Sequence, residues 1–139
     1  MRLWCGNYEA GPDAVFWDLN RSFPFDRRLV REEIAASRAW VRALGRCGAV
    51  PREDAATLER GLDEVLARVS ADSSYLDVDV EDVHSFVEHR LGEIAGDLAG
   101  QAHIGRSRNE QAVTALRLFA RDAIDRLRAG LAGLVRALV

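Results

Sequence analysis

The chain has 139 residues, a formal net charge of −3 and 48% hydrophobic residues, which suits one modest core and excludes a disordered chain or a basic nucleic-acid-binding surface. Cys5 and Cys47 are too few and too far apart for a disulfide framework or a metal cluster, so we expect reduced thiols in a cytoplasmic protein. No window is apolar for the length that a membrane span needs, and charges soon after Met1 interrupt any secretory apolar region. We therefore expect a soluble protein that contacts neither membrane nor nucleic acid.

Residues 1–25 are rich in glycine, proline, asparagine and aromatic residues, which predicts an ordered but irregular arm. Its aromatic side chains need an apolar surface, so we expect a partner chain or the helical body to cover Trp4, Tyr8, Phe16 and Trp17. Pro24 disfavours helix at the residue before it, and Asp26 sits where a carboxylate stabilises the start of a helix.

Three helices are predicted next. The first runs from about 27 to 46, and the second has Pro51 in its first turn. The polar stretch Ser70–Asp79 is typical of a loop, and the third helix runs from about 81 to 95. Their apolar faces hold Leu29, Ile34, Trp40, Val41 and Leu44; then Ala55, Leu58, Leu62, Val65, Leu66 and Val69; then Val83, Phe86, Val87, Leu91 and Ile94.

The octapeptide 103–110 leads into the last helix. Ser107 and Glu110 have the spacing of a capping box, so Ser107 is the predicted N-cap. Arg108 and Asn109 then lie in the first turn, where free N–H groups and the helix dipole favour an anion. Arginine can grip a carboxylate with two hydrogen bonds, and an asparagine amide can donate and accept. On spacing alone, a purely structural cap is the more common outcome.

The last helix is predicted from Arg108 to the end of the sequence, about 45 Å at 1.5 Å per residue. Apolar residues recur every three or four positions along it, a pattern typical of bundles and coiled coils. The stripe consists of Val113, Leu116, Ala120, Ile124, Leu127, Leu131, Leu134 and Leu138. The preceding helices are too short to cover all of it, so we expect the stripe to form an interface, through which the isolated chain self-associates.

Four motifs in order resemble argininosuccinate lyase, in the fumarase and aspartase superfamily. His103-Ile104-Gly105-Arg106-Ser107-Arg108-Asn109-Glu110 is similar to the family's HTGRSRND signature. LWCGNY resembles its LWGGRF, NRSFPFDRRL its entry to the first helix, and EDVHSFVEHRL its EDVHxxVERRL. The resemblance implies an all-α fold, with an arm and helical domain over 1–106 and the first helix of a central bundle over 107–139.

The resemblance also implies which residues bind substrate. They are Ser22, Asp26, Asp82, His84, Arg108 and Asn109. Other roles stay open for some of them, since Ser22 and Asp26 could simply cap a helix, and His84 could be a surface residue. His89 is expected to be solvated, and His103 to hydrogen-bond a loop carbonyl.

Enzymes of this family remove a proton beta to a departing nitrogen, releasing fumarate, and stabilise the resulting carbanion as an aci-carboxylate. Their base is a serine on a GSSxMPxKxNP loop, and a Thr-His pair supplies another catalytic region. Neither motif occurs in these 139 residues, so we expect no catalytic residue here, and the chemistry needs no metal or organic cofactor. Family active sites combine three subunits of a tetramer, which implies a C-terminal lyase chain or further copies as partners.

Two functions remain open. The first is the N-terminal component of a lyase that acts on an N-substituted succinate, whether the chain is a subunit of a split enzyme, a truncated piece or a degenerate remnant. The second is a catalytically silent helical subunit that assembles with, or regulates, a lyase. Ile104 replaces the signature's threonine and Glu110 its aspartate, so a substrate with the same carboxylate end and another amine is a further alternative.

Overall fold

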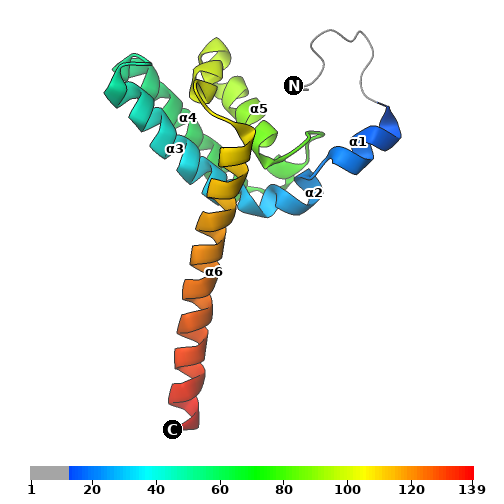
Figure 1. The fold of residues 1–139 in the computed structure, drawn as a ribbon, viewed down its shortest axis with the longest axis vertical. Coiled ribbons are helices and arrows are strands. Elements are labelled where there is room, and N and C mark those ends of the chain that lie inside the picture. Colours follow the sequence, from blue (N-terminus) through cyan, green and yellow to red (C-terminus); the bar gives the residue numbers. More distant parts are fainter. Residues whose placement is uncertain (1–12) are drawn as a thin grey trace.

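A computed structural model describes residues 13–139, and every regular element among them is helical, as the all-α prediction requires. In chain order the α-helices are α1 (Ala14–Asn20), α2 (Phe23–Asp26), α3 (Val30–Cys47), α4 (Arg52–Ala71), α5 (Val83–Ala95) and α6 (Arg108–Leu138). Three 3-10 helices intervene: η1 (Arg27–Leu29), η2 (Ser73–Leu76) and η3 (Gly96–His103). Figure 1 shows α3, α4 and α5 gathered into a body, from which α6 extends as a separate rod. Within residues 13–139, no helix has the length and apolarity needed to cross a bilayer.

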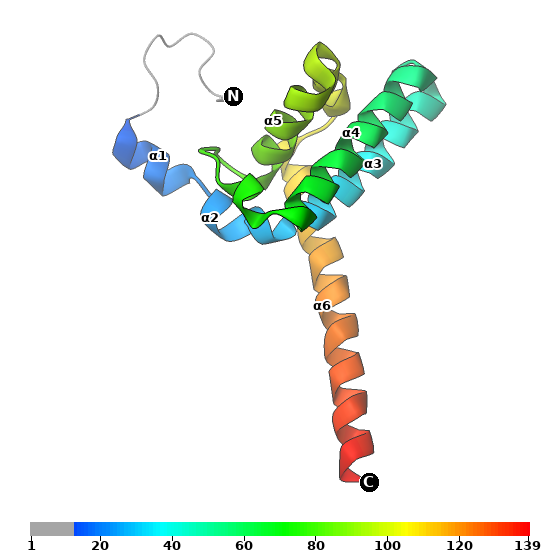
Figure 2. The ribbon, with the colours of Figure 1, turned by 180° about the vertical axis from the view of Figure 1, so that it is seen from behind.

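Helices α3 and α4 form an antiparallel hairpin that supplies half of the core (Figure 2). Gly48 ends α3 with a φ of 79°, the left-handed conformation that favours glycine at a helix C-terminus. The two helices approach closely at Gly45, where an added Cβ would lie 2.8 Å from the Cβ of Ala55. Pro51 is the N-cap of α4, one residue before the predicted first-turn position.

Helix α5 closes the core against this hairpin. Asp82 caps it, and Phe86 on its buried face stacks on Phe23 of α2, with ring centroids 5.3 Å apart. Tyr75 meets the edge of the same ring at 6.2 Å. The predicted apolar faces of the three helices provide most of the buried residues: Ile34, Val41, Leu44, Ala55, Leu58, Leu62, Val65, Val83, Phe86, Val87 and Leu91.

Two segments expected to be irregular contain helix. Residues 14–20 form α1, whose N-cap Asp13 accepts hydrogen bonds from the amides of Val15 and Phe16. The expected loop 70–79 begins with the last turn of α4 and continues into η2, where Asp72 accepts a 2.8 Å hydrogen bond from the amide of Ser74. Short side-chain caps stabilise these turns, which hydrophobic periodicity does not register.

The cover expected over the arm's aromatic residues is only partly present. Trp17 donates an indole hydrogen bond of 3.2 Å to Asp79, but Phe16 is 59% exposed. Trp4 and Tyr8 lie outside the described residues.

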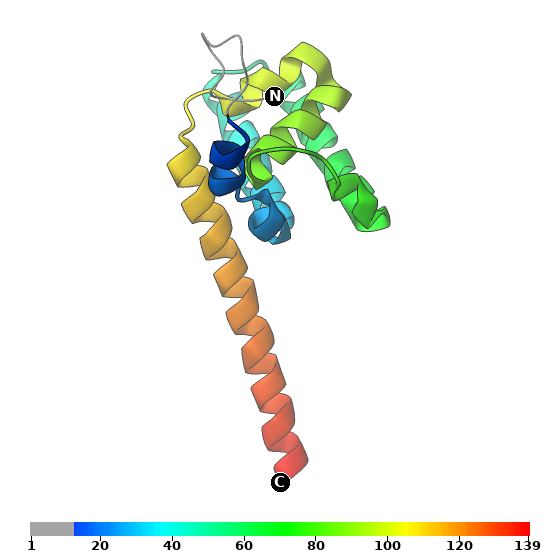
Figure 3. The same ribbon diagram turned by 90° about the vertical axis from the view of Figure 1, so that its right-hand side faces the viewer.

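Helix α6 packs on the body through its first turns only (Figure 3). Gln111 and Ala115 are its buried residues, and they face α3. The predicted apolar stripe lies on other faces of the helix and is exposed from Val113 to Leu138, Leu127 for example at 63%. The body therefore covers none of the stripe, in agreement with the expectation that it exceeds what this chain can cover.

Candidate substrate-binding site

The segment 22–26 is tied to the start of α5. The amides of Ser22 and Phe23 donate to the carbonyl oxygen of Glu81 at 2.8 and 3.0 Å. The Ser22 hydroxyl donates to Oδ2 of Asp26 at 2.6 Å, and Oδ1 of Asp26 accepts from the amide of Val83 at 3.1 Å. Asp26 thus accepts from the first amide of α5, whose N-cap is Asp82, and makes no side-chain cap bond to the helix that follows it in the sequence.

Asp82 and Arg108 join α5 to α6. Oδ1 of Asp82 accepts from the amide of Ser85 at 2.6 Å, while Oδ2 lies 3.4 Å from Nε of Arg108. Nη1 of Arg108 donates to Oε1 of Glu88 and to the side-chain oxygen of Gln111, both at 3.2 Å. The guanidinium of Arg108 is therefore held between two carboxylates of this chain.

His84 is buried, at 4% exposure, and the alternative that it is a surface residue is wrong. Its Nδ1 lies 2.8 Å from Oε2 of Glu33, which is 1% exposed. Oε1 of Glu33 accepts from Ser37 at 2.8 Å and from Gln111 at 3.1 Å, and it lies 3.8 Å from Arg106. A buried polar network thus connects α3, α5, α6 and the loop before α6.

This network is not among the features predicted from the sequence. Glu33 and Ser37 are four residues apart on the face of α3 that also holds Ile34 and Val41. Two polar residues at this helical spacing on an apolar face were the available signal. Arg106 was read only as part of the signature turn, although its side chain is 6% exposed and donates to Ser37 at 2.8 Å.

The network changes the acid–base behaviour of its members. Burial raises the pKa of Glu33, but the hydrogen bond and charge of His84, together with Arg106 and Ser37, outweigh it and leave that pKa below its ordinary value. Burial lowers the pKa of Arg106, and the charge of Glu33 opposes this effect.

The pKa of Asp26 is shifted in the opposite direction to that of Glu33. Burial raises the pKa of Asp26, the hydrogen bond from Ser22 lowers it, and the negative charge of Asp82 raises it again, so the net direction is upward. The charge of His84 lowers this pKa, which places the imidazole within electrostatic reach of the Asp26 carboxylate.

The remaining signature residues lie at the edge of this group. Ser107 is the N-cap of α6, as predicted, but its hydroxyl oxygen accepts from the amide of Asn109 at 3.3 Å rather than from that of Glu110. The Asn109 side chain is exposed and has no hydrogen bond to a described residue. His103 contacts Oε1 of Glu88 at 3.0 Å instead of the expected loop carbonyl.

Five of the six predicted residues therefore come together, while Asn109 stands on the neighbouring turn. The five are Ser22, Asp26, Asp82, His84 and Arg108. Residues 13–139 contain no group of three His, Cys, Asp or Glu side chains placed to hold a metal ion. His89 lies 3.4 Å from Glu93 on the partly exposed side of α5, in keeping with its expected solvation.

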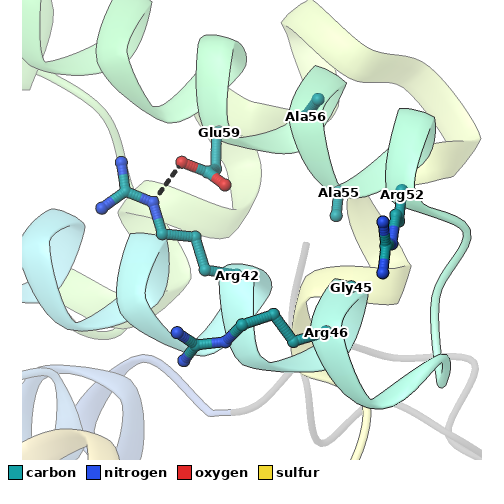
Figure 4. A pocket seen from close by; sticks show the side chains of 7 residues that line it. All are labelled: Arg42, Gly45, Arg46, Arg52, Ala55, Ala56 and Glu59. Carbon is teal, nitrogen blue, oxygen red and sulfur yellow. Dashed lines mark hydrogen bonds and ion pairs between the residues drawn. The ribbon is translucent and has the colours of Figure 1, made fainter.

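A separate surface hollow lies between α3 and α4 (Figure 4). Its lining consists of Arg42, Gly45, Arg46, Arg52, Ala55, Ala56 and Glu59. Arg42 donates to Glu59 across it. None of the predicted substrate-binding residues lines this hollow.

Comparison with known proteins agrees with the resemblance in the motifs. The model of the family described as "Lyase" matches residues 6–139. Argininosuccinate lyase of Roseiflexus castenholzii is 42% identical over 137 residues, which are 99% of this chain and 30% of that protein. Argininosuccinate lyase of Koribacter versatilis is 41% identical over 139 residues, all of this chain and 30% of that protein. The chain therefore belongs to the lyase family, and it spans the N-terminal 30% of the length of the argininosuccinate lyases it matches.

Proposed function

We propose that this chain is the N-terminal component of an argininosuccinate lyase-like enzyme. It would supply carboxylate-binding groups to an active site completed by other polypeptide, a C-terminal lyase chain or further copies of this chain. The reaction is elimination of a C–N bond in an N-substituted succinate, with release of fumarate. The sequence identity to two argininosuccinate lyases and the length that the chain shares with them support this proposal.

The observation that carries the proposal is the convergence of Arg108 with Asp82 and the Ser22–Asp26 pair at the start of α5. These residues come from separate parts of the sequence, and each has a defined polar partner there. A positively charged guanidinium at the first turn of a long helix is suited to a carboxylate that gains negative charge in the transition state.

Arg108 must exchange a partner to bind substrate. Its contacts to Asp82 at 3.4 Å and Glu88 at 3.2 Å are long, and its side chain is 25% exposed. Partly exposed ion pairs of this kind contribute little to stability, so a substrate carboxylate can replace one of them at small cost. Asn109, with a free amide on the same turn, would contact the substrate beside Arg108.

Complementation tests this function. The chain is mixed with a polypeptide that carries the remaining part of the Roseiflexus castenholzii argininosuccinate lyase, and fumarate release from argininosuccinate is followed by ultraviolet absorbance. We expect turnover from the mixture and from neither component alone. Arg108→Ala should abolish turnover while co-sedimentation of the two chains is retained; the matched control Arg42→Ala removes an arginine from the separate hollow and should leave turnover intact. Unchanged turnover in Arg108→Ala would remove this residue from the site.

A second function, a catalytically silent assembly or regulatory subunit, is favoured by one observation: the exposed apolar stripe on α6. It predicts that the chain binds a complete argininosuccinate lyase and alters its rate, without supplying any site residue. Under this alternative, Arg108→Ala would have no effect on turnover in the mixture.

A further inference from the structure

The carboxylate of Glu33 presents its two oxygens to different groups. Oε1 receives hydrogen bonds from the Ser37 hydroxyl at 2.8 Å and the Gln111 amide nitrogen at 3.1 Å, and Nη1 of Arg106 lies 3.8 Å away. Every group near Oε1 is therefore a donor. Oε2 lies 2.8 Å from Nδ1 of His84, an ion-pair contact whose angle departs from that of a regular hydrogen bond, and both atoms are buried without another partner in the described part of the chain.

The state of this carboxylate decides where the imidazole hydrogen lies. Glu33 has a pKa below its ordinary value because the surrounding donors and positive charges outweigh its burial, so it is ionised at neutral pH. An ionised carboxylate can only accept hydrogen bonds. A ring nitrogen 2.8 Å from it must carry a hydrogen, since two lone pairs at this distance repel.

We propose that Glu33 is a positioning residue, which keeps a hydrogen on Nδ1 of His84 and leaves Nε2 of the neutral ring as a hydrogen-bond acceptor. The role of this nitrogen in substrate binding rests on the proposed function; the assignment of the hydrogen does not. Nε2 is the ring nitrogen that Glu33 does not contact.

The His84 ring lies within electrostatic reach of the candidate site. Asp26 interacts electrostatically with His84, and Asp26 is itself bound to Ser22 and to the start of α5. The charged side chains of the elements around the ring are Glu33 on α3, Asp26 on α2, Asp82 at the cap of α5, Arg106 in the loop and Arg108 on α6. With the hydrogen held on Nδ1 by Glu33, Nε2 of the neutral ring can accept a hydrogen bond from a ligand.

Nitrogen-15 NMR of the ring nitrogens in the full chain tests this assignment. His84 is identified by loss of its signals in His84→Gln. We expect Nδ1 of the neutral ring to show the shift of a hydrogen-bearing nitrogen and Nε2 to show the shift of a bare nitrogen. A bare Nδ1 in the neutral ring would overturn the proposal.

Glu33→Gln provides a sharper result. Three donors surround the position of Oε1 in Glu33, so we expect the carbonyl oxygen of the new amide to occupy that position. The NH2 group of the amide then faces His84. Nδ1 must then accept, and we expect the hydrogen of the neutral ring to move to Nε2. A role of Glu33 in packing alone would leave the hydrogen on Nδ1, and this result in a folded variant would also overturn the proposal.

Ser37→Ala is the matched control. It removes one donor to Oε1 and leaves the contact between Oε2 and Nδ1 in place, so the ring signals should match those of the wild type. Addition of succinate to the wild type separates this inference from the proposed function. Succinate that leaves the side-chain signals of Arg108 and Asn109 unmoved counts against the proposed substrate site, while the hydrogen assignment of His84 stands on the ligand-free spectra.

Discussion

The indole nitrogen of Trp40 donates a 3.0 Å hydrogen bond to the carbonyl oxygen of Ile104, 64 residues further along the chain. The bond holds the loop between η3 and α6 against α3. Gly105 follows with a φ of 69°, and a Cβ at this glycine would lie 3.7 Å from the Trp40 ring. The loop leads directly to Arg108, so Trp40 contributes to the placement of that guanidinium.

Trp40→Phe is expected to loosen this loop. The variant keeps an aromatic ring but loses the donor to Ile104, which should cost about 1 kcal/mol of unfolding free energy. Amide hydrogen exchange should accelerate over 103–107, while the centre of α4 stays protected. Trp17→Phe removes an equivalent indole hydrogen bond, to Asp79, and should not affect exchange over 103–107. Equal exchange in Trp40→Phe and wild type would contradict a role for this bond.

Glu33→Gln is expected to lower the unfolding free energy by about 3 kcal/mol at neutral pH, because Arg106 loses a buried counter-charge. The folded-state pKa of Glu33 lies below its ordinary value of 4.5. Its contribution is therefore present above 4.5 and is lost as the pH falls through the lowered pKa. Urea unfolding at a series of pH values should show that the difference in unfolding free energy between wild type and variant becomes smaller in acid.

A gap that widens in acid would show that this carboxylate is not stabilised in its charged form. Glu93→Gln is the matched control on α5, where the glutamate pairs with Arg90 and His89 at the surface. Its effect should stay within about 0.5 kcal/mol.

Asp26→Asn should show the reverse pH dependence. The pKa of Asp26 in the folded state is raised above its ordinary value of 3.8, chiefly by burial. A raised pKa gives a contribution that is present below 3.8 and is lost as the pH rises through the raised value. The stability of the wild type relative to Asp26→Asn should therefore decrease from acid toward neutral pH.

The same urea series measures this effect, with Asp72→Asn as the comparison. The pKa of Asp72 is lowered by hydrogen bonds from the Ser74 side chain and amide, so its small effect should run in the opposite direction. Parallel pH profiles for the two variants would contradict the assignment for Asp26.

Leu127→Gln is expected to weaken self-association of the chain, because it places an amide in the centre of the exposed stripe on α6. Sedimentation velocity over a concentration series should show a larger share of monomer than in the wild type. Ala129→Gln introduces the same side chain two residues on, about 200° around the helix, and should leave association unchanged. A wild-type chain that sediments as a monomer at all concentrations would remove the stripe as a self-association surface.

Periodicity and glycine caps were sufficient to predict α3, α4, α5 and α6 closely. Gly48 ends α3 and Ser107 caps α6 as expected, since these signals are local to the sequence. Short capped turns such as α1 and η2 escaped prediction, because a few residues held by one aspartate have no apolar period.

The residues of the candidate site also fall into two groups, those that the sequence predicts and those that it does not. The resemblance identified Ser22, Asp26 and Arg108, and the structure brings them near one another; their roles stay predictions. Glu33 escaped notice because its importance depends on His84, 51 positions away, and no local pattern reports a contact across three helices. The exposure of the stripe on α6 agrees with the expectation, whereas Gln111 and Ala115, which are buried on another face of the helix, were not singled out by the apolar pattern.

Helix α6 packs on the body through its first turns, so a small tilt there moves its far end by a large distance. Beyond Ala115 its remaining residues span about 35 Å at 1.5 Å per residue, and none of them is buried against the described part of the chain. A tilt of about 10° at the base swings the far end of a rod of this length through roughly 6 Å. Conversely, a partner that binds the far end of α6 fixes the angle of its first turn. The orientation of Arg108, which lies in that turn, is then fixed as well.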